Sequence, residues 1–280
     1  MSRPARPSNA SSWLSVELGG GRVAWMRRVP SRRARRLRLS VEPEGVLRLT
    51  LPPRVASRSV ERFLAESRGW IIARLAELDA LGARRAPLKV GVGDEFLLRG
   101  RPWPLVWRVS AEPRLLSQPG WLELHVARLN DAELPLARSL LRDFLSAELR
   151  RDALRIGRKL AARLGVAPAA LRIRPLRSLW GSLSAARRMS LDLALIHAPP
   201  AVLHYVIAHE LAHLKIRSHS SRFWQLVAEL DPEFEHAREW IRSQGIRLKA
   251  ELYRLLGSPS AKEGPGEAMP LRFARGWARS

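Results

Sequence analysis

Residues 201–224, AVLHYVIAHELAHLKIRSHSSRFW, decide how this chain is organised. They contain the pattern H-E-x-x-H as His209, Glu210 and His213, followed six residues later by His219. Residues four apart lie on the same face of a helix, so His209 and His213 can direct their rings at one ion. Glu210 is placed to reach a water on that ion without being a ligand itself. The stretch therefore predicts a helix that carries a metal site.

A third ligand is required, because a catalytic zinc takes three protein ligands and keeps one position open. His219 suits this role, since residues 214–216 can end the helix and Arg217-Ser218 can turn the chain back toward the ion. Glu229 on the following helix is an alternative, although it also fits a solvated helix face. We expect one Zn²⁺ per chain, held by His209, His213 and His219, with Glu210 as general base.

The predicted metal helix is apolar nearly all round, as expected of a helix in a protein core. Its apolar residues are Val202, Val206, Ile207, Leu211 and Leu214. Two imidazoles and a carboxylate are costly to bury in such surroundings unless something pairs them. Pairing by ordinary hydrogen bonds is the alternative to a metal.

Composition predicts a folded chain without cysteine chemistry. The 280 residues are 46% hydrophobic, which is ample for a core, and no residue is cysteine. Disulfides, Cys-ligated zinc and thiol catalysis are therefore excluded. We expect a cytoplasmic protein without membrane contact, because we find neither a signal-peptide pattern nor a run of about 18 apolar residues.

A formal net charge of +23 favours contact with nucleic acid, nucleotides or other anionic surfaces. Arginine accounts for most of this charge and is densest between Arg27 and Arg38. That cluster can line a surface that binds polyanions, or it can be a solvated strand edge. The abundance of Arg over Lys is also typical of GC-rich coding.

The order of predicted elements indicates an α+β protein. Residues 1–12 are expected to be a disordered leader and residues 13–130 a β-rich module carrying one helix from Ser57 or Ser59 to Leu81. Residues 131–246 form the predicted catalytic domain, and residues 247–280 a helical extension and a disordered basic tail. Within the module we expect strand pairs at 13–18 with 22–28 and at 36–41 with 46–51, the latter turning at Glu44-Gly45.

Further elements are predicted around the metal helix. We expect strands at 95–99, 103–109 and 121–126, and a long helical segment from about Asp131 to Leu164, broken or bent near Pro135. Strands follow at 171–174 and 189–195, and the second of these can present an edge to which an extended peptide adds. Pro199-Pro200 opens the metal helix, and helices at 221–230 and 233–244 follow it.

The sequence resembles the bacterial family of YgjP-like metallopeptidase domains and, more distantly, the SprT-like proteases. The strongest similarity lies in residues 180–182 (WGS), 189–200, Tyr205, 209–213 (HELAH), 219–220, 223–224 (FW) and around Trp240. Weaker similarity reaches back to about Arg22. The resemblance implies a zinc-dependent hydrolase with a minimal gluzincin-like catalytic domain.

Three positions depart from the family pattern. Leu179 and Leu183 flank the WGS motif where the family commonly has Arg and Cys, and Asp192 replaces a frequent Asn. None of them is a predicted metal ligand. The departures therefore concern substrate contacts rather than zinc.

Four residues are candidates for contact with substrate or with the transition state: Tyr205, Trp180, Ser182 and Arg187. Tyr205 lies four residues before His209 and so on the same helix face. Its alternative role is that of a core aromatic residue with a satisfied hydroxyl. His204 is a further candidate.

Three functions are compatible with these residues. The first is a zinc metallopeptidase acting on a peptide or protein. The second is a metal-dependent pyrophosphohydrolase of nucleoside triphosphates such as UTP, although the chain shows neither a P-loop nor a carboxylate cluster. The third is a nucleic-acid-associated protein with a structural zinc. The presence of Glu210 beside an open ligand set argues against the third. The sequence does not specify the oligomeric state.

Overall fold

The computed structural model describes residues 13–19, 22–41, 47–80, 87–176 and 179–257. The protein is α+β, as predicted, and divides between Arg85 and Ala86 into two compact units with separate cores. A domain boundary near residue 130 was expected from the sequence instead. The structure divides earlier because strands within residues 94–126 share one core with the helices that follow them. No helix among the described residues is long and apolar enough to cross a membrane.

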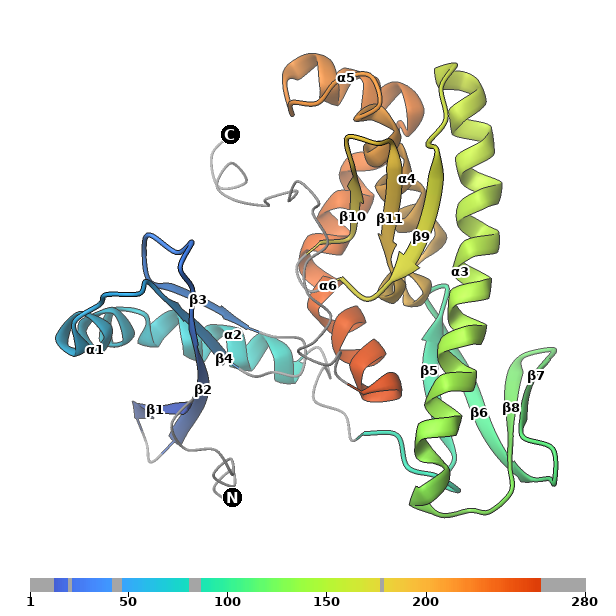
Figure 1. Ribbon diagram of the computed structural model, residues 1–280, viewed down its shortest axis with the longest axis horizontal. Coiled ribbons are helices and arrows are strands. Elements are labelled where there is room, and N and C mark those ends of the chain that lie inside the picture. The colour runs from blue at the N-terminus through green and yellow to red at the C-terminus, as the bar shows by residue number, and fades with distance from the viewer. Residues whose placement is uncertain (1–12, 20–21, 42–46, 81–86, 177–178, 258–280) are drawn as a thin grey trace. The chain divides into compact units, whose positions relative to one another are not determined.

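The first unit consists of a four-stranded sheet and two helices (Figure 1). Its elements are β1 (Trp13–Gly19), β2 (Arg22–Pro30), β3 (Arg38–Val41), β4 (Leu47–Leu51), α1 (Ser57–Glu66) and α2 (Arg68–Ala80). The strand order is β1-β2-β4-β3, with β2 and β4 parallel and the other pairs antiparallel. Leu47, Leu49 and Leu51 are buried against the two helices, so one face of the sheet forms this unit's core.

Both strand pairs predicted for this unit are confirmed, but the single helix is not. The expected helix from Ser57 is divided at Ser67, whose N–H donates to the Phe63 carbonyl at 3.0 Å. Ser67 and Gly69 are weak helix formers, which accounts for the division. The Glu44-Gly45 turn, Leu81 and the two predicted disordered ends lie outside the described residues.

The second unit contains two sheets packed with helices. Its strands are β5 (Asp94–Leu98), β6 (Arg101–Val109), β7 (Arg114–Gln118), β8 (Trp121–Val126), β9 (Ala170–Arg174), β10 (Gly181–Leu183) and β11 (Arg188–Asp192). Its helices are η2 (Asp131–Glu133), α3 (Leu134–Leu164), η3 (Leu193–His197), α4 (Pro200–Ala212), α5 (Ser221–Leu230) and α6 (Phe234–Leu256). The strand orders are β5-β6-β8-β7 and β10-β11-β9. The predicted 131–164 helical segment is divided near Pro135, as expected, because η2 ends at Glu133 and α3 begins at Leu134 with Pro135 in its first turn.

Helix α4 lies at the centre of this unit. It contacts α3, α5, α6, η3 and β10, and in Figure 1 it lies behind the sheet of β9, β10 and β11. Residues 205–212 of α4 are all buried. The apolar composition predicted for this helix therefore reflects contact with neighbours on every side.

The strand expected at 189–195 is shorter and does not form an edge. β11 ends at Asp192, whose carboxylate accepts a hydrogen bond from the Ala194 N–H at 2.8 Å, and the chain continues as η3. β11 is the central strand of its sheet, with β10 antiparallel on one side and β9 parallel on the other. An added peptide strand would therefore have to pair with β10 or β9.

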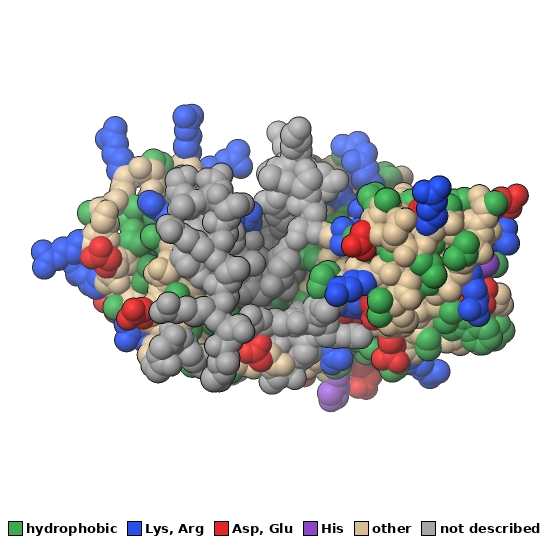
Figure 2. All heavy atoms as spheres, turned by 90° about the horizontal axis from the view of Figure 1, so that it is seen from below, with side chains coloured by type: hydrophobic (Ala, Val, Ile, Leu, Met, Phe, Trp, Pro, Cys, Tyr) green, Lys and Arg blue, Asp and Glu red, His purple; other side chains and the backbone are tan. Residues whose placement is uncertain are grey.

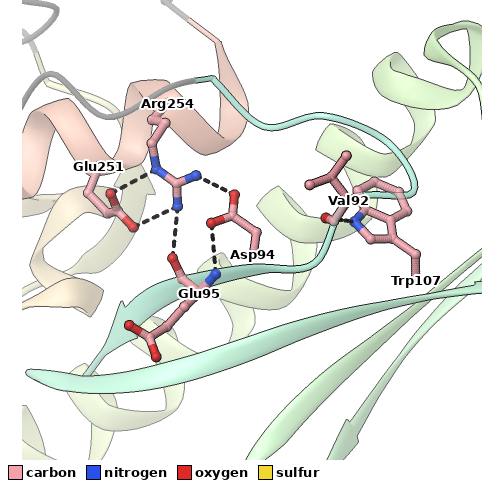
Figure 3. Close-up of polar contacts among 6 residues, drawn as sticks. All are labelled: Val92, Asp94, Glu95, Trp107, Glu251 and Arg254. Carbon is pink, nitrogen blue, oxygen red and sulfur yellow. Dashed lines mark hydrogen bonds and ion pairs between the residues drawn. The ribbon is translucent and has the colours of Figure 1, made fainter.

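The predicted helix at 233–244 and the predicted helical extension form one continuous helix, α6, which reaches Leu256. Residues 248–256 of α6 are buried. Near its end, the Arg254 guanidinium binds the Glu251 carboxylate at 2.9 and 3.0 Å, the Glu95 carbonyl at 3.0 Å, and the Asp94 carboxylate (Figure 3). The end of α6 is thereby joined to the start of β5. In the same region Trp107 Nε1 donates to the Val92 carbonyl at 2.9 Å.

Candidate metal centre

Helix α4 carries His209, Glu210 and His213 at its end. His209 is 5% exposed and Glu210 1% exposed, and α4 ends at Ala212, so that His213 is its C-terminal cap. The ring centroids of His209 and His213 lie 5.0 Å apart, as the spacing of four predicts. Both rings therefore face the same side of the helix end.

The turn after α4 returns the chain to this side. The N–H of Leu214 donates to the carbonyl of Leu211, and the N–H of Ile216 donates to the carbonyl of Ala212. These hydrogen bonds form a turn that ends the helix. His219 then lies with its Nε2 atom 3.2 Å from Nε2 of His209. One nitrogen from each of His209, His213 and His219 lies within 4.8 Å of the others, and these three form the candidate metal group among the described residues.

Aromatic residues from α5 fix the orientation of the histidine rings. Phe223 stacks on His213 with centroids 4.5 Å apart, and Trp224 stacks on His219 at 5.9 Å. Nδ1 of His213 lies 3.1 Å from the Ile216 carbonyl, which leaves Nε2 of that ring for an ion. The aromatic packing therefore presents three ring nitrogens to one point.

The protonation states of the histidines suit a metal. Burial, and then the proximity of His213 and His219, lowers the pKa of His209 well below its ordinary value of 6.5. Burial likewise lowers the pKa values of His213 and His219. All three imidazoles are therefore neutral near pH 7, which is the form that binds zinc.

Glu210 provides the test of whether a cation fits here. Its carboxylate is buried, and neither oxygen has a hydrogen-bond partner within the described residues. Burial raises its pKa from 4.5 to about 8. A nearby cation would favour the charged form, as would a water hydrogen-bonded to it, so the residues present fit a metal site.

A small pocket adjoins Glu210. It is lined by Trp180, Gly181, Tyr205, Val206, His209, Glu210 and Ile241. Trp180 and Tyr205, which were predicted to contact substrate or the transition state, both line this pocket. Tyr205 is buried, stacks on Phe234 with centroids 6.3 Å apart, and has a pKa raised by burial.

Gly181 is required by the carboxylate of Glu210. A Cβ at Gly181 would lie 2.6 Å from Oε1 of Glu210. The next residue, Ser182, is buried and pairs through the backbone with Ser190 of β11. Strand β10 therefore lies directly against the candidate base.

Other proposed contacts lie elsewhere or have other partners. Arg187 lies in the loop between β10 and β11, and its guanidinium donates to the Ala167 carbonyl at 2.7 Å. His204 lies 3.2 Å from the Asp231 carboxylate, and Glu229 is exposed and outside the histidine group. No interaction described for Arg187 or Glu229 reaches the three histidines.

Two residues near the site were not anticipated from the sequence. Lys249 is 7% exposed and lies over Trp180, with Nζ 4.6 Å from the ring centroid. Arg238 lies over Trp224 at 4.6 Å, and its charge contributes to lowering the pKa of His219. Both residues belong to α6. Sequence reasoning could have placed them near the site only through a spacing pattern that links α6 to the metal helix.

Asp192, one of the departures from the family pattern, is the partner of Lys249. Its carboxylate lies 2.9 Å from Nζ of Lys249 and accepts from the N–H of Leu176 and Ala194. Lys249 also donates to the carbonyls of Leu176 and Leu179. A carboxylate at residue 192 therefore balances a buried ammonium.

Two of the solved structures similar to this chain are metallopeptidase zymogens. The metallopeptidase zymogen abylysin of Pyrococcus abyssi is 28% identical with a TM-score of 0.31, and the match covers 33% of this chain and 93% of abylysin. Jannalysin of Methanocaldococcus jannaschii, also a metallopeptidase zymogen, is 21% identical with a TM-score of 0.30, covering 33% and 95%. No curated protein sequence matches the chain.

A family comparison covers most of the chain. The family described as the YgjP-like metallopeptidase domain matches residues 35–244, which include β10, β11, α4 and all three histidines. The chain belongs to the YgjP-like metallopeptidase domain family.

Proposed function

We propose that this protein is a zinc-dependent peptidase in which His209, His213 and His219 hold one ion and Glu210 is the general base. The observation that carries the proposal is the convergence of three neutral ring nitrogens within 4.8 Å of one another beside a buried, unpartnered carboxylate. Family membership supports the same reaction class. A zinc ion would supply a Lewis acid for the scissile carbonyl and would acidify a bound water.

The protein's own residues would orient the reactants and move the proton. An oxygen of Glu210 would accept a proton from the attacking water and pass it to the leaving amine. Gly181 permits β10 to approach this carboxylate, and the backbone of β10 is an edge of the sheet in the described structure. An extended substrate paired there would place its scissile carbonyl beside the water that Glu210 would activate.

The first experiment is a metal analysis of the purified protein beside His219→Ala. We expect about one zinc per wild-type chain and loss of most of it in the variant, because two ligands hold zinc far less tightly than three. Glu229→Ala is the matched control and should retain its zinc, since Glu229 is exposed and outside the histidine group. Stoichiometric zinc in His219→Ala would remove His219 from the ligand set.

Activity is then measured with casein or a peptide library, using Glu210→Gln as the inactive control. The variant should bind zinc and remain folded but lose turnover by at least about a hundredfold, since it cannot accept the proton. Retained turnover would remove Glu210 as the base. Pyrophosphate release from UTP without peptide cleavage would replace the peptidase by the nucleotide hydrolase.

A further inference from the structure

The excess positive charge of the first unit lies in its strands and in the link between β2 and β3. From Arg22 to Val41 and from Leu47 to Leu51, the described chain contains arginine as its only charged residue type. Helices α1 and α2, in contrast, carry two basic and two acidic residues each. The helices cover the apolar face of the sheet, so the excess of positive charge belongs to the strands and to the link between β2 and β3.

Strand register places three arginines on the face of the sheet opposite the helices. Arg27 of β2 is aligned with Arg48 of β4, and Arg38 of β3 is aligned with Thr50, two residues further along β4. Leu47 and Leu49, which alternate with Arg48, are buried in the core. Arg27, Arg38 and Arg48 therefore share the outer face, because alternate residues of a strand lie on opposite sides.

The link between β2 and β3 extends this charge beyond the sheet. It begins where the N–H of Ser31 donates to the carbonyl of Leu51, and so it passes the end of β4. Arg32, Arg33, Arg35 and Arg36 are all exposed there. On the face drawn in Figure 2, Lys and Arg side chains project from the described surface more widely than Asp and Glu.

We propose that the outer face of the β1-β2-β4-β3 sheet, together with the 31–37 link, binds single-stranded nucleic acid. Arginines spaced across adjacent strands can contact successive phosphates of a chain laid over them. Within residues 13–80, the buried apolar residues of β2 and β4 pack with those of α1 and α2, on the face opposite these arginines. Unpaired bases can lie on the face of a sheet.

Aromatic residues occur at neighbouring register positions. The antiparallel pairing of β1 and β2 aligns Trp13 with Arg27 and Trp25 with Ser15. This binding surface is separate from the metal site, and it does not depend on the proposed peptidase activity.

The experiment measures binding of the full chain to a labelled oligothymidylate by fluorescence anisotropy at several salt concentrations. The sheet variant is Arg27→Gln/Arg38→Gln/Arg48→Gln, and the matched helix variant is Arg58→Gln/Arg62→Gln/Arg68→Gln. Each variant removes three positive charges from the same unit. In the sheet variant we expect affinity to fall by at least about tenfold and the slope of log K against log salt to fall by about 2. The helix variant should stay within about twofold of wild type.

Several outcomes would overturn the proposal. Equal losses in the two variants would mean that binding follows net charge alone. A duplex of the same length that binds as tightly would exclude selection of single strands. Displacement of the oligonucleotide by poly-glutamate at equal charge would show a general anion-binding surface.

Arg27 and Arg48 are half-buried, so a second variant guards against misfolding. Arg36→Gln/Arg38→Gln changes two exposed residues only. It should unfold at the wild-type temperature and lower the salt slope by about 1.4. Removal of zinc with a chelator should leave oligonucleotide binding unchanged, and a loss of binding would place the strand at the metal site and contradict the proposal.

Discussion

Glu210 is a carboxylate that lies among apolar neighbours and beside three imidazoles. Burial alone raises its pKa to about 8, because nothing in the described structure donates to either oxygen. In the absence of a metal, folding therefore favours the protonated acid between its ordinary pKa of 4.5 and about 8. A bound cation reverses this preference, since it stabilises the carboxylate.

The pH dependence of stability should reveal this carboxylate. The folded metal-free protein binds more protons than the unfolded chain between about pH 4.5 and 8, so Glu210 lowers stability as the pH rises through this range. Glu210→Gln removes the effect and leaves the histidines unchanged. The stability of the variant relative to wild type should therefore grow by up to about 1.4 kcal/mol per pH unit. Urea unfolding of both chelated proteins at pH 5, 6, 7 and 8 measures the difference, and a constant difference would contradict it.

Among the helices and strands, α6 supports the site although it lies well after the metal helix in the sequence. Lys249 of α6 pairs with Asp192 at the end of β11 and lies over Trp180, the residue before β10. A Cβ at Gly245, one turn earlier in α6, would lie 2.6 Å from Cζ2 of Trp180. Trp180 is thus held between a glycine and an ammonium, and β10 is held against Glu210.

Removal of the Lys249 ammonium should destabilise the second unit strongly. Lys249→Met leaves the buried Asp192 carboxylate without its cation, which costs about 3–5 kcal/mol. Lys159→Met, at an exposed position of α3, is the matched control and should change stability by less than about 0.5 kcal/mol. Adding Asp192→Asn to Lys249→Met should restore part of the loss, because the unpaired charge is removed. Chemical denaturation gives the values, and equal effects in the two Lys variants would contradict this account.

At the scale of the whole molecule, the two units have independent hydrophobic cores. The core of the first unit contains residues 18–71 only, and that of the second begins at Leu88 and ends at Leu256. All three histidines, Glu210 and β10 belong to the second unit. Metal binding and nucleic-acid binding are therefore assigned to different units.

A chain that begins at Ala86 should fold and retain the metal site. We expect it to bind about one zinc and to keep the peptidase turnover of the full chain, because the residues of the site and their core all follow Arg85. The same fragment should lose oligonucleotide binding. Zinc analysis and anisotropy test the two statements, and a fragment that folds but binds no zinc would contradict the first.

The metal helix and the family could both be inferred from local sequence patterns. His209, Glu210 and His213 could be placed because helical periodicity is a local property, and His219 because a short turn limits where the chain can go next. The alternation at residues 36–41 and the turns at residues 19–21 and 44–45 likewise predicted the paired strands of the first unit. Strands β5, β6 and β8 of the second unit were also predicted. β7, with the sequence RLLSQ, shows no such alternation and was not predicted.

The neighbours of these residues depend on tertiary packing. The contact of Gly181 with Glu210, the Asp192–Lys249 pair and the central position of β11 each join segments far apart in the chain. The division after Arg85 likewise depends on which core β5–β8 enter. Such contacts follow from long-range packing, and periodicity along one segment does not specify the partner segment that buries it.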